Sequence, residues 1–124
     1  MEYIEKDGKS GFKLHKDYNY IGQSSDGFVL VKGCRELVEV KIVVTADFNF
    51  PTWKNKHMSQ MQLGMQIHDC SHCHFIVYDG KYDMNKNIDE NHIHAERIER
   101  DEKWFNNFFD ERKTGKYKLS CLVL

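Results

Sequence analysis

The sequence predicts an α/β domain in which helices pack against a mixed β-sheet. Three observations lead to this fold class: apolar runs of strand length, apolar residues at helical spacing, and the alternation of the two along the chain. The 124 residues suit one domain, and an apolar content of 40% suffices for one core. With one proline, no repeat and no low-complexity tract, residues 1–124 form a single predicted domain.

The first half of the chain predicts a β-hairpin. Residues 1–20 are polar and aromatic, and turn signals at Asp7-Gly8 and Ser10-Gly11 suit a short hairpin or a loose lead-in. Strands are then predicted from Phe28 to Lys32 and from Glu36 to Thr45. The Lys-Gly-Cys-Arg sequence between them has the composition of a turn, so the two strands are expected to pair.

The second half of the chain alternates helices and strands. A loop over 46–52 ends at Pro51, and a helix is predicted from Trp53 to about Ile67. The segment from Phe75 to Tyr78 predicts a short buried strand, and a polar excursion then leads to a strand from His92 to Ile98.

The last predicted helix has an aromatic face. Asp101 can cap this helix, which runs to about Arg112, and Gly115 is a plausible stop signal. The aromatic residues at helical spacing, expected to face the core, are Trp104, Phe105, Phe108 and Phe109.

Composition excludes several classes of protein. The formal net charge is −1, from 18 basic and 19 acidic residues, so no global basic field indicates a nucleic-acid partner. No stretch approaches the roughly 20 apolar residues of a membrane span, and the N-terminus has no signal-peptide core. We therefore expect an intracellular protein without a membrane partner, whose four cysteines are free thiols.

A carboxylate and an ammonium lie two residues apart on the second predicted strand. Because alternate side chains of a strand point to opposite faces, Glu39 and Lys41 share one face with Leu37 and Val43. The valine and isoleucine side chains at 38, 40, 42 and 44 share the other face. Burying either charge is unfavourable unless a partner compensates it. A cross-strand salt bridge at a sheet edge would explain the pair, and so would a functional site.

A second carboxylate, Asp26, precedes the first strand of the hairpin. If the two strands pair, Asp26 approaches Glu39. Two carboxylates with a backbone carbonyl and waters make a hard-cation site suited to Mg²⁺ or Mn²⁺. Lys41 beside them could orient or deprotonate a water and balance charge on a phosphate. Alternatively, Asp26 is a residue of an ordinary Asp-Gly turn.

Five segments of the chain carry a resemblance to a known family. The segment Tyr20–Val29 (YIGQSSDGFV) resembles its metal-binding Asp segment, Val38–Lys41 (VEVK) its E-x-K strand, and His57–Met65 (HMSQMQLGM) its third motif, a helix with a glutamine. Phe75–Asp79 and Ile98–Trp104 resemble its closing strand and final helix. The family is that of the lambda-exonuclease and YqaJ-type viral recombinases, which are PD-(D/E)XK nucleases. The resemblance covers residues 20 to about 112 and implies a restriction-endonuclease-like core.

The resemblance implies a role for each matching residue. Asp26 and Glu39 would bind the metal, helped by the Val40 carbonyl. Lys41 would position the attacking water. Gln60 would take the place of the motif-three glutamine, which lies near the catalytic lysine.

Three further residues of these motif segments are expected to contact nucleic acid, namely Ser24, Ser25 and His57. The chain departs from the family pattern at two of them, because Ser25 stands where the family often has Pro and His57 where it often has Tyr. The long helical N-terminal region of family exonucleases has no counterpart in the 25 residues before Asp26, so we expect a minimal core.

A run of His and Cys over 68–74 (HDCSHCH) raises a further possibility, since these residues at such spacings can bind Zn²⁺. The cysteines are only three apart and no second C-x-x-C follows. We therefore expect His72 and His74 to face outward on a strand while Cys73 and Phe75 pack inward.

The function implied by the resemblance is Mg²⁺- or Mn²⁺-dependent hydrolysis of DNA phosphodiester bonds. The parent activity is 5′-to-3′ exonuclease action on duplex ends, in viral, phage or mobile-element recombination or replication, in the cytoplasm or nucleus of a host cell. A homo-oligomer is compatible with this function. The alternatives are a structure-selective endonuclease or resolvase acting as a dimer, and a non-catalytic nucleic-acid-binding module of the same fold.

Overall fold

The structure, a computed structural model, describes residues 2–4, 12–17, 21–43, 48–80 and 89–113. Its centre is a five-stranded sheet in the order β1-β4-β5-β6-β7. These strands are β1 (Glu2–Ile4), β4 (Gly27–Val31), β5 (Cys34–Ile42), β6 (His72–Tyr78) and β7 (Ile93–Glu99). Strands β5 and β6 run parallel and the other neighbours antiparallel, which confirms the predicted mixed sheet.

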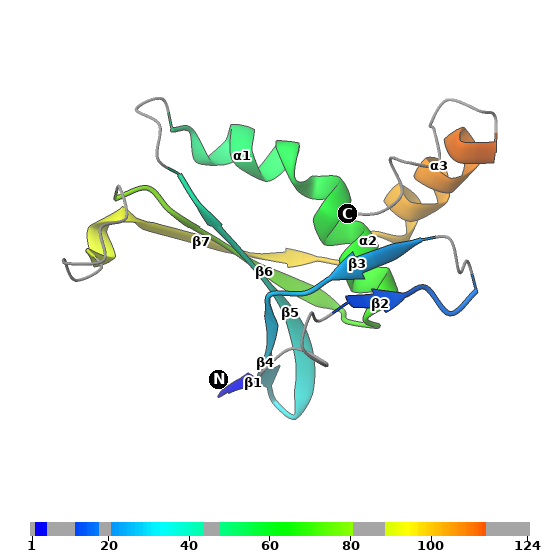
Figure 1. The fold of residues 1–124 in the computed structure, drawn as a ribbon, viewed down its shortest axis with the longest axis horizontal. Helices are drawn as coiled ribbons and strands as arrows, with labels where there is room; N and C mark the ends of the chain where they lie inside the picture. The colour runs from blue at the N-terminus through cyan, green and yellow to red at the C-terminus, as the bar shows by residue number, and fades with distance from the viewer. Residues whose placement is uncertain (1, 5–11, 18–20, 44–47, 81–88, 114–124) are drawn as a thin grey trace.

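Helices α1 (Phe50–Lys56) and α2 (Met58–Ile67) connect the two parallel strands, as a parallel pair requires, and lie over one face of the sheet (Figure 1). A two-stranded ribbon of β2 (Phe12–Leu14) and β3 (Gly22–Ser24) packs beside α2. A 3₁₀ turn (Glu90–His92) precedes β7, and α3 (Glu102–Lys113) follows it. The main core between sheet and helices includes Phe28, Leu37, Met61, Met65 and Phe75, none of which is exposed.

The predicted hairpin is present as β4 and β5. Lys32 and Gly33 have φ values of 50° and 82°, which fits a two-residue type I′ turn that matches the twist of the flanking strands. The turn signals at 7–11, the predicted strand end at 44–45 and the stop signal at Gly115 lie outside the described residues.

The predicted single helix from Trp53 to Ile67 is wrong in two respects. It begins at Phe50, because Asn49 caps it: the Asn49 Oδ1 accepts from the Thr52 N–H at 3.0 Å. Pro51 therefore lies in the first helical turn, where its missing N–H leaves no intrahelical bond unmade. The helix is also divided at His57, which has φ −103° and ψ 9° and ends α1 while beginning α2.

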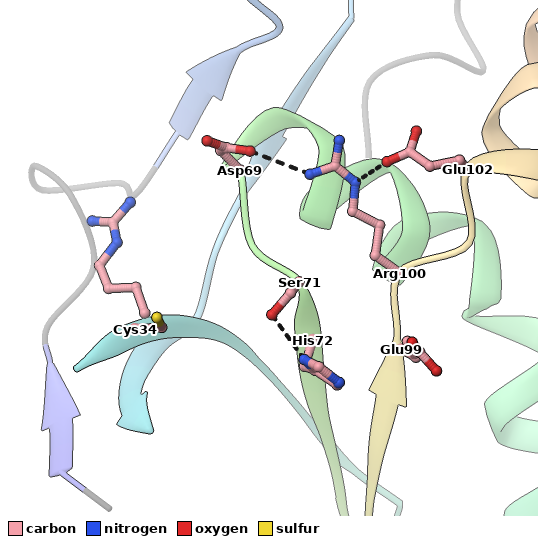
Figure 2. Close-up of a pocket in the computed structure, with 8 residues that line it drawn as sticks. Cys34, Asp69, Ser71, His72, Glu99, Arg100 and Glu102 are labelled. Carbon is pink, nitrogen blue, oxygen red and sulfur yellow. Dashed lines mark hydrogen bonds and ion pairs between the residues drawn. The ribbon is translucent and has the colours of Figure 1, made fainter. Parts of the chain in front are cut away.

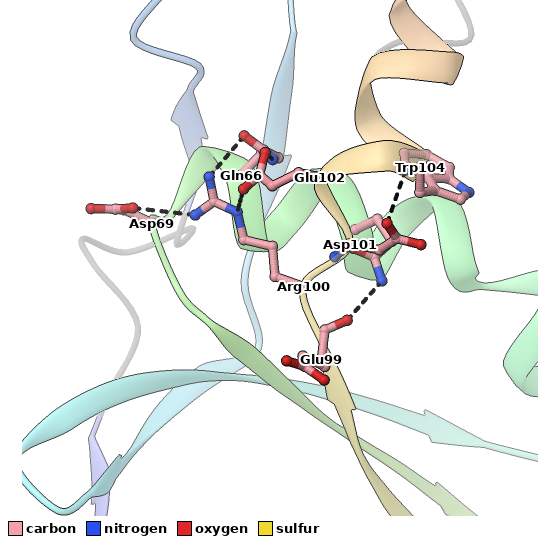
Figure 3. Close-up of polar contacts among 8 residues, drawn as sticks. Gln66, Asp69, Glu99, Arg100, Asp101, Glu102 and Trp104 are labelled. Carbon is pink, nitrogen blue, oxygen red and sulfur yellow. Dashed lines mark hydrogen bonds and ion pairs between the residues drawn. The ribbon is translucent and has the colours of Figure 1, made fainter.

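The last helix agrees with its predicted bounds and cap, while the side chain of Phe109 lies outside the described residues. The Asp101 Oδ1 accepts from the Trp104 N–H at 3.2 Å, and Phe105 is buried against α2. Figure 3 shows the polar contacts that join this region to α2, among them an Arg100–Gln66 hydrogen bond of 3.0 Å. The buried Gln62 of α2 also takes part: it accepts from the Asp101 N–H at 2.8 Å and donates to the Glu99 carbonyl at 3.1 Å.

The two faces of β5 differ in a way that its valine-rich sequence does not suggest. Glu39 is buried beneath the helices, whereas Val40 and Ile42, on the opposite face, are 42% and 52% exposed. The predicted alternation of side chains is therefore present over the described part of the strand, but the apolar residues of its second half face outward.

An ion-pair network around the buried Glu36 carboxylate lies on the outward face, at the other end of β5. The Glu36 carboxylate is 3% exposed and accepts from Arg97 Nε at 2.8 Å, Arg97 Nη2 at 2.6 Å and His74 Nε2 at 2.8 Å. These contacts join β5, β6 and β7. The Arg97 hydrogen bonds, the largest cause, lower the pKa of Glu36 to about 2.

We expect Glu36→Gln to destabilise the fold by about 1–2 kcal/mol at pH 7, a modest value because Arg97 is half exposed. A carboxyl whose pKa is lowered on folding stabilises the protein above its unfolded-state pKa near 4.5, and this stability is lost as the pH falls toward about 2. Urea denaturation of both proteins at pH 7 and pH 3 measures the difference. If the two proteins differed in unfolding free energy by the same amount at pH 7 and at pH 3, the lowered pKa of Glu36 would be contradicted.

Candidate functional site

Three of the residues singled out in the sequence come together where β3, β4 and β5 meet. Asp26 lies between β3 and β4, and Glu39 and Lys41 lie on β5. The last residue pair between β4 and β5 is Gly27 with Val38. Asp26 precedes Gly27 and Glu39 follows Val38, so these two residues are the next to face each other beyond that pair. The Val40 N–H donates to Asp26 Oδ2 at 2.8 Å and ties Asp26 to the strand.

Glu39 is the most unusual residue of this region, because a carboxyl group with 1% exposure lies in the core face of the sheet. Burial, and then the charge of Asp26 together with a hydrogen bond between the two carboxyl groups, raise the pKa of Glu39 to about 8. The charge of Lys41 and a hydrogen bond from Gln23 lower it, but by less. The chain therefore holds two carboxyl groups in contact at a place that favours a nearby cation.

Lys41 is half-buried and follows Glu39 on the same face of β5. Its charge acts on Glu39, whose pKa it lowers, and on His57, whose pKa is lowered first by burial and then by Lys41. The ammonium group thus lies within electrostatic reach of both the carboxyl pair and the break between α1 and α2.

The third motif also lies beside the carboxyl pair. The backbone carbonyl of Gln60 accepts from Gln23 Nε2 at 3.3 Å, and the same Nε2 donates to Glu39 Oε1 at 2.9 Å. The Gln60 side chain is half-buried. Gly64, one turn further on, allows close packing, since a Cβ there would lie 2.8 Å from Leu37 Cδ2.

The residues expected to contact nucleic acid differ in their accessibility. Ser24 is exposed. Ser25 is 2% exposed and its Oγ has no hydrogen-bond partner among the described residues, so in this conformation it does not offer its hydroxyl to DNA. His57 is half-buried against Trp53 and Phe75, with ring centroids 5.4 and 6.0 Å away. Of the three residues expected to contact nucleic acid, only Ser24 is therefore fully on the surface of the described structure.

The donor set at the carboxyl pair fits a hard divalent cation. Asp26 and Glu39 supply carboxylate oxygens, and a cation between them would offset the repulsion that raises the pKa of Glu39. The N–H and C=O of one residue in an extended strand point to the same side, so the Val40 carbonyl is turned toward Asp26 as its N–H is. Within the described ranges there is no group of three or more His, Cys, Asp or Glu side chains arranged for a metal, so waters would complete the shell.

The His and Cys run forms no metal centre in the described part of the chain. Cys73 and Phe75 are buried on the core side of β6, while His72 and His74 are on the other face, 3.6 and 2.8 Å from the Glu36 carboxylate. Burial raises the pKa of the Cys70 thiol to about 11 and raises that of Cys73 further. Both cysteines are therefore protonated, and the predicted alternation of this strand is confirmed.

Gln23 and His68 belong to this region although the motifs did not indicate them. Both are buried, at 0% and 2% exposure, and Gln23 Oε1 lies 2.9 Å from His68 Nε2. The only sequence signal was the placement of Gln23 three residues before Asp26 in a polar stretch. Polar residues commonly surround a turn, so this placement does not by itself indicate a buried amide.

A hollow of about 630 Å³ opens at the opposite end of β5 and β6, between Cys34, Ser71 and Arg100. Figure 2 shows that Arg100 points toward two acids, forming ion pairs with Asp69 at 3.3 Å and Glu102 at 2.6 Å. Two arginines, Arg35 and Arg100, line the hollow together with three acids, Asp69, Glu99 and Glu102. The hollow therefore lacks the net positive charge that a phosphate group would need.

Comparison with known proteins gives a likeness to solved structures only: no protein-family model and no curated protein matches the sequence. A structure of LHK-Exo in complex with dAMP superposes with a TM-score of 0.62 at 23% identity, over 96% of this chain and 57% of that one. A structure of an alkaline exonuclease (LHK-Exo) from Laribacter hongkongensis gives a TM-score of 0.63 at 21% identity, over 96% and 58%.

The chain has the fold of this alkaline exonuclease. The expected restriction-endonuclease-like core is thereby confirmed. The chain spans just over half the length of the exonuclease structures it matches. Among the residues of this chain that the structure describes, no helix is long and apolar enough to cross a membrane.

Proposed function

We propose that this protein is a metal-dependent DNA nuclease whose site is formed by Asp26, Glu39 and Lys41. The observation that carries the proposal is the contact between the Asp26 and Glu39 carboxyl groups, one of them buried, with a lysine on the same strand. A buried carboxyl group such as Glu39, with a raised pKa and a second carboxyl group in contact with it, is unfavourable for stability alone and is typical of functional sites. The exonuclease fold supports the same function.

In this proposal Asp26, Glu39 and the Val40 carbonyl hold Mg²⁺ or Mn²⁺. When bound, the cation supplies positive charge that polarises the scissile phosphate and lowers the pKa of a water molecule. The Lys41 ammonium group would donate a hydrogen bond that orients that water and would balance negative charge on the phosphate. In its neutral amine form Lys41 would instead take the proton of the water and become the ammonium group. Gln60 assists Lys41 from α2, and the exposed Ser24 lies where a DNA strand would approach Asp26.

The finer features of the proposal come from the likeness to the exonuclease and the family resemblance. They are 5′-to-3′ digestion of duplex DNA ends, a role in viral or phage recombination or replication, and assembly as a homo-oligomer. The structure in complex with dAMP, a nucleotide, supports a nucleotide-binding site on this fold.

Incubation with end-labelled linear DNA and with circular DNA, in Mg²⁺ and in EDTA, tests the proposal. We expect degradation of the linear substrate in Mg²⁺ and none in EDTA. Nicking of circles would indicate instead a structure-selective endonuclease or resolvase. Binding of DNA without cleavage by the folded protein in Mg²⁺ or Mn²⁺ would indicate the non-catalytic module and contradict the nuclease.

Gln60 offers a separate test of the third motif. We expect Gln60→Ala to reduce DNA cleavage by roughly tenfold, because the variant loses a group that helps to position Lys41 and the water. The fold should be kept, since the contact from Gln23 is to the Gln60 backbone carbonyl. Cleavage at the normal rate by this variant would remove Gln60 from the proposed site.

A further inference from the structure

Gln23 is a buried amide that contacts three residues, one on β5 and two on α2 and its C-terminal end. It lies on β3 with no exposed surface. Its Nε2 donates to Glu39 Oε1 on β5 at 2.9 Å and to the Gln60 carbonyl on α2 at 3.3 Å. Its Oε1 lies 2.9 Å from His68 Nε2, at the end of α2. Both ends of the amide are therefore in hydrogen-bond contact.

The direction of these hydrogen bonds fixes the amide in one orientation. An amide nitrogen only donates and an amide oxygen only accepts. The carboxylate and the Gln60 carbonyl both need a donor, so Nε2 faces them, and His68 Nε2–H then donates to Gln23 Oε1. If the amide were turned round, its oxygen would face two acceptors.

Gly64 provides the space for this amide. A Cβ at Gly64 would lie 2.6 Å from Gln23 Nε2 and 2.9 Å from Gln23 Cδ, closer than real contacts allow. A glycine in a helix interior is less favourable than an alanine. Its presence here is explained by the space that Gln23 and Leu37 occupy.

We propose that Gln23 is a positioning residue. Its Nε2 holds the Glu39 carboxylate by donating to Glu39 Oε1, and His68 fixes the orientation of the Gln23 amide. The carboxylate is thereby placed to meet a divalent cation shared with Asp26. The inference rests on the proposed function and adds a part of the site that neither the family motifs nor the spacing of acids indicates. Residues that orient metal ligands typically change metal affinity or activity by 10–100-fold when they are removed.

The first test replaces Gln23 with leucine, which keeps the side chain buried but removes the amide. We expect Mn²⁺ affinity, measured by titration calorimetry, to fall about tenfold, and the Mn²⁺ concentration needed for half-maximal DNA cleavage to rise in parallel. The matched control is Gln62→Leu. Gln62 is a buried glutamine of α2 whose hydrogen bonds go to Glu99, Asp101 and the Met58 sulfur instead of to Glu39. This control should change the melting temperature without changing Mn²⁺ affinity.

The second test is a double-mutant cycle, which remains informative if Gln23→Leu does not fold. Gly64→Ala introduces a methyl group that must displace the Gln23 amide, so this variant should also bind Mn²⁺ more weakly. In a Gln23→Ala background there is no amide to displace, and of the three close neighbours only Leu37 Cδ2 remains, at 2.8 Å from the added Cβ. Gly64→Ala should therefore have little further effect on Mn²⁺ affinity, although the Leu37 contact lowers the stability of both Gly64→Ala variants. The two changes should therefore be non-additive, as expected for residues that act through one contact.

Wild-type Mn²⁺ affinity in folded Gln23→Leu, or independent effects of Gly64→Ala and Gln23→Ala, would overturn the positioning role. Failure of the proposed function gives a different result. In that case the wild-type protein and Glu39→Gln would bind Mn²⁺ equally, and no residue around Glu39 would be positioning a metal ligand.

Discussion

Replacing Lys41 with alanine is expected to lower DNA cleavage by roughly 10²-fold or more, the usual loss for a positioned acid–base group. Mn²⁺ affinity should survive or rise, because Asp26 and Glu39 remain and a neighbouring positive charge is gone. Stability should change little, since the ammonium group is held at a half-buried position where its charge is unfavourable.

A purely structural Lys41 would give the opposite pattern. Glu39 would lose a compensating charge, the fold would weaken by about 3 kcal/mol, and activity would fall only with the folded fraction. Melting temperature, Mn²⁺ affinity and turnover per folded molecule separate the two cases. Lys54→Ala is the matched control, because Lys54 forms an exposed ion pair with Glu96 on β7 and its loss should leave turnover unchanged.

Replacing Glu39 with glutamine is expected to have an even larger effect on the site. Cleavage should fall by at least about 10²-fold and Mn²⁺ affinity should fall with it, because one of two carboxylate ligands is lost. In EDTA, by contrast, the variant should be more stable than the wild type at pH 8, by up to about 3 kcal/mol.

The pH dependence follows from the direction of the pKa shift. Folding raises the pKa of Glu39 from 4.5 to about 8, mainly through burial and the charge of Asp26. A group with a raised pKa stabilises the fold fully below its unfolded-state pKa, and this stability is lost as the pH rises through its folded-state pKa. Metal-free wild-type protein should therefore become less stable, relative to Glu39→Gln, between about pH 4.5 and pH 8.

Urea denaturation at pH 5 and pH 8, in EDTA and in Mn²⁺, measures this dependence. Mn²⁺ should restore the stability of the wild type at pH 8 but not change that of Glu39→Gln. Equal stability of the two proteins at both pH values in EDTA would mean that Glu39 is not held as an unfavourable buried acid.

Part of this site is predictable from the sequence because strand geometry is simple. The period of two places Glu39 and Lys41 on one face of β5, and a two-residue turn at Lys32-Gly33 brings Asp26 next to Glu39. The order of strands and helices along the chain is sufficient to predict a mixed sheet. The helical connection between β5 and β6 is also what a parallel pair requires.

Other parts depend on tertiary packing and have no local signal. Gln23 takes its role from the approach of α2, which Gly64 makes possible. The Glu36 network needs the register of three strands at once. The break at His57 interrupts a segment whose apolar residues keep helical spacing throughout. The start of the helix was predicted after Pro51, whereas Asn49 caps a helix that includes Pro51 in its first turn.

Val40 takes part in the site through its backbone alone. Its N–H holds Asp26, while its side chain is 42% exposed on the opposite face of the sheet. Position 40 should therefore accept almost any residue except proline, which would remove the N–H. A cysteine placed there would allow a fluorophore or a surface tether to be attached one residue from both Glu39 and Lys41, on the face of the sheet opposite to their side chains.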